Sequence, residues 1–145
     1  MPEQETIERA REDAREGKSP STQAGEFVRE EIHHIREGKH GARSAKQAIA
    51  IGLSKARRAG VKLGTPKGSA EVRKKAAQDE KASKSPRHKT STTRSRATEA
   101  ALKREPRSSA SKSALSRQTK TAAAKRGKSA RSAAAAKGAR TRKAA

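Results

Sequence analysis

The chain has 145 residues, of which 37 are lysine or arginine and 15 are aspartate or glutamate, so its formal net charge is +22 and its pI is about 11.4. Leu, Ile, Val and Phe together make up about 9% of the residues, well below the roughly 20% under which a highly charged chain is expected to be disordered. One conventional core for the whole chain is therefore excluded. Because the chain has no cysteine, disulfides, thiolate nucleophiles and zinc–thiolate sites are excluded as well.

The composition also indicates a compartment and a class of partner. No apolar run approaches the roughly 20 residues of a membrane span, and the acidic first segment is unlike a signal peptide. We therefore expect a soluble cytoplasmic protein that does not bind membranes. A basic surplus of this size favours a polyanion as partner, which in a cell mostly means DNA or RNA.

Charged and large apolar side chains are distributed unevenly along the chain. Residues 1–70 have 14 basic and 10 acidic side chains, a net +4, whereas residues 71–145 have 23 and 5, a net +18. Most large apolar side chains lie between Phe27 and Val72, so we expect the core there. The predicted fold is all-α, with four parts: a charged N-terminal helix (1–18), a helical hairpin module (19–68), a weak helix and linker (69–105), and a disordered basic tail (106–145).

The first two helices follow from charge spacing and apolar periodicity. Residues 1–18 alternate in charge and contain Ile7 as the only large apolar residue after Met1, which predicts a solvated helix that ends at Gly17. A second helix is predicted from about residue 21 to 37, ending at Gly38. Its apolar face comprises Ala24, Val28, Ile32 and Ile35, with Phe27 beside them.

A third helix begins at a capping box, Ser44 followed by Gln47, and is predicted to end at Gly60. Its apolar stripe contains Ala48, Gly52 and Ala56, whose small side chains would let a neighbouring helix approach closely. The same stripe would suit a homodimer through the hairpin. A weaker fourth helix, from about residue 69 to 82, has Val72 as its only large apolar anchor.

The loop over residues 38–44 joins the second and third helices and has the composition of a phosphate clamp. Gly38, Gly41 and Ser44 would offer backbone N–H groups next to a helix N-terminus, and Lys39 and Arg43 add charge. Its G-x-x-G string, with Lys39 and His40 in the middle, resembles the loop of K-homology RNA-binding domains, although the chain has no credible strands for their sheet. The alternative is a plain turn, in which Gly38 ends one helix and Gly41 turns the chain toward the next.

Other cations are candidate phosphate contacts. The third helix has basic residues beside its apolar stripe, as a recognition helix would, and a solvated face explains them equally well. These are Lys46, Lys55, Arg57 and Arg58. Further candidates lie in the tail: Lys125, Arg126, Lys128, Arg131, Lys137, Arg140, Arg142 and Lys143.

The tail has 12 basic residues and no acidic one from Pro106 onward. Its low complexity and lack of apolar side chains predict disorder, with latent helicity from its alanines. The composition is similar to the tails of linker histones and bacterial histone-like proteins. Such cations neutralise phosphates without reading bases. Because Phe27 is the only aromatic residue, stacking on single-stranded bases is disfavoured and DNA is favoured over RNA.

Metal and catalytic sites are not predicted. Glu30 with His33, and Glu31 with His34, form two overlapping E-x-x-H pairs, the spacing of di-iron carboxylate bundles. One helix cannot supply the remaining ligands, so we expect exposed or partly packed histidines, no metal and no cofactor. No acid–base pair or nucleophile motif accompanies the serines, so no catalytic residue is assigned.

Residues 21–63 resemble an uncharacterised family of short basic bacterial proteins. The resemblance rests on two strings, STQAGEFVREE and GKHGARSAKQAIAIGLSKARRAGV. Members of that family carry variable basic tails and are sometimes labelled plasmid stabilisation or DNA-binding proteins. The resemblance implies a bacterial cytoplasmic protein and transfers no functional residue.

These patterns favour a non-enzymatic protein that binds DNA without sequence preference, in nucleoid organisation or in plasmid or chromosome maintenance. Two alternatives remain open. One is a protein-interaction or dimerisation module with a basic localising tail, and the other is an RNA- or ribosome-associated factor.

Overall fold

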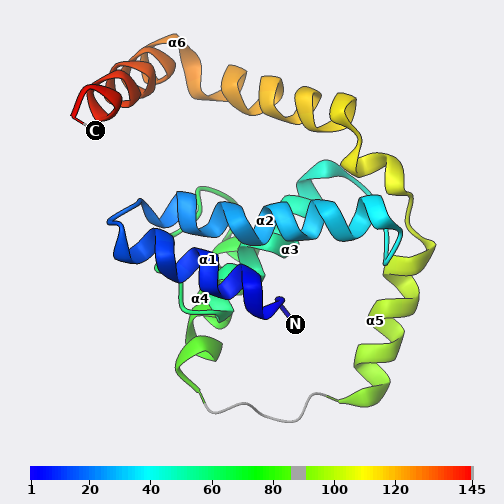
Figure 1. Ribbon diagram of the computed structural model, residues 1–145. Coiled ribbons are helices and arrows are strands. Elements are labelled where there is room, and N and C mark those ends of the chain that lie inside the picture. Colours follow the sequence, from blue (N-terminus) through cyan, green and yellow to red (C-terminus); the bar gives the residue numbers. More distant parts are fainter. Residues whose placement is uncertain (86–90, 145) are drawn as a thin grey trace.

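The structure, a computed structural model, describes residues 1–85 and 91–144. Every element in this part of the chain is helical (Figure 1). The elements are α1 (Gln4–Arg15), α2 (Pro20–Glu37), α3 (Ala45–Arg58), α4 (Ala70–Lys84), α5 (Thr92–Arg104), the short 3-10 helix η1 (Arg107–Ala110) and α6 (Lys112–Ala144). The all-α prediction is confirmed. No helix among these is long and apolar enough to cross a membrane.

Glycines follow the ends of the first three helices and a serine caps the start of α3, as the sequence predicted. Gly17, Gly38 and Gly60 have positive φ values of 74°, 81° and 97°, the left-handed conformation that ends helices at little cost for glycine. After Gly38, for example, the Lys39 N–H donates to the His34 carbonyl at 3.0 Å. At the start of α3, the Gln47 N–H donates to Ser44 Oγ at 3.3 Å, and Gln47 Oε1 accepts from the Arg43 N–H at 2.7 Å.

The core consists of two small clusters along α2. One joins α1, α2 and α3 and contains Ala10, Ala24, Phe27 and Ala56. The other joins α2, the loop after it, α3 and η1, and contains Ile35, Ala42, Ala48 and Ala110. Most of these side chains are alanines, so the helices are held by close backbone approach more than by large buried side chains.

Helix α1 belongs to this core, which corrects the expectation of a solvated N-terminal helix. Thr6 and Ala10 are buried, and Ile7 packs against the first cluster. The sequence suggested solvation because α1 has a single large apolar residue. Small side chains are sufficient here, since α2 presents Ala24 and Phe27 to the same cluster.

Helices α2 and α3 approach each other closely at Gly52. A Cβ placed on Gly52 would lie 2.7 Å from the Val28 Cα, so no larger residue fits without moving a helix. Ala48, Gly52 and Ala56 are all buried. The stripe of small residues predicted for close helix approach is therefore occupied by α2 of the same chain.

Helix α4 is anchored by an acidic side chain, not by Val72, which is 50% exposed. Asp79 is buried against α3, where Ser54 Oγ donates to its Oδ2 at 2.6 Å and Arg58 Nε donates to its Oδ1 at 2.8 Å. Burial alone would raise the pKa of Asp79, but these hydrogen bonds and the charges of Arg58 and Lys75 lower it.

The prediction of a long disordered tail over residues 106–145 is wrong. η1 packs against α2, α3 and α6, with Ser109 and Ala110 buried, and α6 extends from Lys112 to Ala144. Disorder was inferred from the lack of apolar surface, which limits tertiary packing but not local helix formation. Alanine, lysine and arginine are among the strongest helix formers, and Ser111 Oγ accepts from the Ala114 N–H at 3.2 Å to cap the start.

Candidate nucleic-acid interface

Helix α6 carries a dense set of basic side chains with no acidic neighbour along the chain. It contains 11 lysines and arginines and no aspartate or glutamate, and none of its residues is buried. The eight tail cations predicted as phosphate contacts all lie on α6 and are exposed. Within the described residues, none of them forms an ion pair with a carboxylate of the chain. The charge of α6 therefore faces solvent.

Gly127 divides α6 into two helical segments. Its backbone angles, φ 75° and ψ 166°, are not helical, and lie in a region that essentially only glycine occupies. The helix contacts α3 and η1. In the view of Figure 1 it then extends above α2, separate from it, and bends before its C-terminal half (orange to red). Two basic arms thus meet at an angle.

A cleft of about 460 Å³ lies where α6 meets α3. Both helices begin there, at Ser44 and Ser111, so their positive dipole ends face the same space. Arg43, Lys46 and Arg117 line the cleft. Hydroxyl residues make up half of the lining, and Ala45, Ala114 and Gln118 complete it. The hydroxyl residues are Ser44, Ser108, Ser109, Ser111, Ser113 and Thr121. Guanidinium, ammonium, hydroxyl and helix N-terminal groups are what a phosphate binds.

The predicted clamp loop lies against a later part of the chain. The Gly41 N–H donates to the Leu102 carbonyl at 2.9 Å, and the Ala42 N–H donates to the Pro106 carbonyl at 3.2 Å. A Cβ on Gly41 would overlap the Glu105 carbonyl. Glycine is thus explained at position 41 by the approach of residues 102–106, and the backbone donors that a phosphate would use are engaged within the fold.

Several predicted contact residues are paired with carboxylates. Lys39 Nζ lies 3.2 Å from Glu37 and 3.3 Å from Glu3, and these hydrogen bonds raise the pKa of Lys39. Arg58 pairs with Asp79. Lys55 pairs with Glu30 and Glu31, and His40 with Glu31. The charges of these side chains are already paired with carboxylates within the fold.

The remaining predicted cations of the module differ in position. Arg43 and Lys46 reach the cleft, although Arg43 Nε also lies 3.7 Å from Glu105 Oε1. Arg57 lies outside it, and no ion pair with the described residues involves it. Sequence reasoning missed Arg117, Lys112 and Lys120, which continue the basic surface of α6 toward the cleft. Ser111 is a helix-capping residue, and this signal could have predicted that a helix starts at Lys112 and includes Arg117.

Residues 4–67 match the profile of a family of unknown function (DUF6496). The match spans α1, α2 and α3 and ends before α4. It includes residues 21–63, in which the sequence resembled an uncharacterised family, and adds α1, in agreement with the packing of α1 in the core. Searches of curated proteins and of solved structures gave no match. Helix α6 and the cleft residues after position 67 lie outside the matched region.

Proposed function

We propose that the protein is a non-enzymatic nucleic-acid-binding protein that contacts DNA phosphates without reading base sequence. The observation that carries the proposal is the exposed surface of α6, where 11 cations face solvent with no acidic residue on the helix. Cations that lack internal partners neutralise a polyanion without first breaking ion pairs. Release of counterions from DNA then supplies the free energy of binding.

The length and charge distribution of α6 are those of a basic rod that could lie along DNA. At about 1.5 Å per residue, the segments on either side of Gly127 are each about 20–25 Å long. Basic residues surround each segment, so α6 has no narrow reading face of the kind that a recognition helix presents. This distribution supports contact with phosphates along a groove and not sequence readout.

The cleft at the start of α6 extends this surface onto the helical body. Arg43 belongs to the loop before α3, Lys46 to α3 and Arg117 to α6. A phosphate bound in the cleft would therefore contact both α6 and the helical body formed by α1 to α4. We place the protein on double-stranded DNA, since Phe27, its one aromatic residue, is buried and offers no platform for bases. Nucleoid organisation or plasmid or chromosome maintenance is the corresponding setting.

The proposal predicts how salt controls binding. Fluorescence anisotropy of a labelled duplex, titrated with the full chain between about 50 and 200 mM salt, should give a steep linear fall of log affinity with log salt. The triple variant Lys125→Gln, Arg126→Gln, Arg131→Gln should bind more weakly. If each of the three side chains neutralises one phosphate, the slope should also become shallower by about 2.7.

A matched control separates local contacts from overall charge. Arg73→Gln, Lys74→Gln and Lys81→Gln remove three exposed cations from α4 and change the net charge equally. We expect this variant to retain most of the wild-type slope. Equal losses in both variants would refute α6 as the binding element, and a preference for duplex RNA over DNA of the same sequence would favour the RNA-associated alternative.

A further inference from the structure

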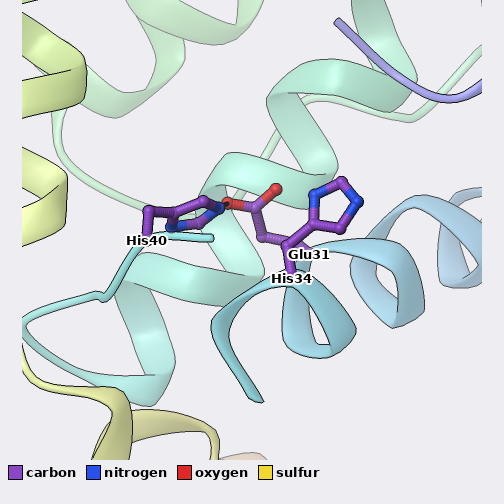
Figure 2. Close-up of side chains that lie close together, drawn as sticks. All are labelled: Glu31, His34 and His40. Carbon is purple, nitrogen blue, oxygen red and sulfur yellow. Dashed lines mark ion pairs between the residues drawn. The ribbon is translucent and has the colours of Figure 1, made fainter. Parts of the chain in front are cut away.

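Glu31, His34 and His40 form a cluster in which three potential metal ligands face one another (Figure 2). Glu31 and His34 lie one turn apart on α2, and His40 belongs to the loop before α3. Their ligand atoms all lie within 4.8 Å of one another. Figure 2 shows the Glu31 carboxylate between the two imidazole rings, whose centroids are 6.3 Å apart.

The hydrogen bonds of the two histidines fix which nitrogen is free to bind a metal. His40 Nδ1 lies 3.0 Å from the Gly41 carbonyl, which can only accept, so Nδ1 carries the proton. His34 Nε2 lies 2.8 Å from Glu3 Oε1, so Nε2 carries the proton there. Each histidine thus turns its other nitrogen toward Glu31, and each has the carbonyl or carboxylate partner that metal-bound histidines ordinarily have.

The closest ligand atoms lie at the centre of the cluster. His40 Nε2 lies 3.2 Å from Glu31 Oε1, and this contact is favourable when a cation lies between the two atoms, either a proton on Nε2 or a bound metal ion. Tetrahedral Zn²⁺ with bonds of about 2.0–2.1 Å separates neighbouring ligand atoms by about 3.3 Å. The His40–Glu31 pair already has this spacing. The other ligand atoms, which lie within 4.8 Å of one another, reach it by shortening their distances by at most about 1.5 Å.

The charge around the cluster is compatible with a divalent ion. Glu3, Glu30 and Glu31 provide three carboxylates, and Lys39 and Lys55 provide two ammonium groups. Lys55 Nζ lies 2.6 Å from Glu31 Oε2, an atom that is buried and accepts no hydrogen bond from the described residues. Glu31 can therefore bind a metal through Oε1 while Oε2 stays beside Lys55.

We propose that Glu31, His34 and His40 bind one late first-row divalent ion, with Zn²⁺ as the expected occupant, in a site that stabilises the fold. Two imidazoles and one carboxylate are ligands that suit Zn²⁺. The site joins α2 to the loop before α3, and through Glu3 and Lys55 it reaches α1 and α3. A chain with so few large buried side chains gains from a metal that ties its helices together. The sequence predicted no metal because Glu31 and His34 lie on one helix, which cannot supply further ligands. The structure adds His40 from the loop before α3.

The test is titration of the full chain, freed of metal by a chelator, with zinc chloride in a calorimeter. We expect one Zn²⁺ per chain with a Kd of about 1 μM or lower, and a rise in Tm of about 5–10 °C at 100-fold excess of Zn²⁺ over the Kd. His34→Ala and His40→Ala should each weaken binding at least tenfold. Glu3→Ala, at an exposed position where no loss of fold is expected, should weaken it about tenfold through the His34 ring.

His33→Ala is the matched control. His33 is the neighbouring histidine on α2, exposed to solvent and paired with Glu37 at 2.9 Å, so its loss should leave the Zn²⁺ affinity unchanged. Absence of Zn²⁺ binding by the wild-type chain would overturn the proposal. So would wild-type affinity in both His34→Ala and His40→Ala, or a loss in His33→Ala as large as theirs. Circular dichroism checks that each variant is folded, and Glu3→Ala decides the case if either histidine variant is not.

Discussion

Three glycines show how differently one residue type acts in this chain. Gly41 lies against the backbone of residues 105 and 106, and Gly52 lies against the Val28 backbone. Gly25 is exposed in the N-terminal half of α2, and a Cβ there would have no heavy atom within 4 Å beyond its own helix and neighbours. The first two positions require the absence of a side chain, whereas at Gly25 glycine only adds flexibility to the unfolded chain.

This difference predicts opposite effects of the same substitution. Gly41→Ala should lower the free energy of unfolding by about 1–3 kcal/mol, since the new methyl group must displace the Glu105 carbonyl. Gly25→Ala should raise it by about 0.5–1 kcal/mol. Urea unfolding of each variant, followed by circular dichroism, measures both. Wild-type stability in Gly41→Ala would show that the loop does not lie against residues 105 and 106.

At the scale of the elements, α4 depends on one buried carboxylate. Asp79→Asn should remove its charge-assisted hydrogen bond with Arg58 and lower the stability by about 1–2 kcal/mol. The neighbouring substitution Glu80→Gln affects an exposed pair with Lys84, 3.6 Å apart, and should cost less than about 0.5 kcal/mol. Equal effects of the two substitutions in urea unfolding would contradict the anchoring role of Asp79.

The same carboxylate predicts a pH dependence. Because the folded chain lowers the pKa of Asp79 below its ordinary value of 3.8, its contribution to stability is fully present above that value. It is lost as the pH falls through 3.8 toward the lowered pKa. The stability difference between wild type and Asp79→Asn should therefore be constant near neutral pH and shrink below about pH 4. A difference that grows in acid would contradict this assignment.

Gly127 predicts the shape of α6. Gly127→Ala should favour continuation of the helix, because alanine cannot adopt φ 75°, ψ 166° without strain. A continuous helix places Ser113 and Ala144 about 46 Å apart at about 1.5 Å per residue, and the bend at Gly127 brings them closer. Since the chain has no cysteine, spin labels at Ser113→Cys and Ala144→Cys report the distance directly. An unchanged distance distribution in Gly127→Ala would show that Gly127 does not cause the bend.

Local signals predicted α2 and α3 well, whereas contacts distant in sequence could not be predicted. Apolar spacing, the Ser44 cap and the glycine stops gave both helices, because each signal acts within one turn. The role of α1, of Asp79 and of Ala110 depends on which elements meet in space. His40 joins Glu31 and His34 for the same reason, since the path of its loop is fixed by hydrogen bonds to residues 102 and 106.

At the scale of the whole molecule, the structure separates two kinds of charge. Carboxylates and cations of α1 to α4 pair with one another and hold the helices together, as Lys55 and Arg58 do. Helix α6 has cations alone. The chain thus combines a helical body stabilised by internal pairs with a basic helix, α6, whose charges lack acidic partners on the same helix. The match to a family of unknown function covers α1 to α3 of the body and does not reach α4 or α6.

Hydrogen–deuterium exchange of the full chain, with and without a duplex of about 20 base pairs, tests the proposed binding element most directly. Helix α6 is exposed and, among the described elements, contacts η1 and α3 alone, so in the free protein its amides should exchange faster than those of α2 and α3. DNA should slow exchange over residues 112–144 and around Arg43 and Lys46, and leave α1 and α4 unchanged. Slowed exchange confined to α1 to α4, with none in α6, would contradict the account.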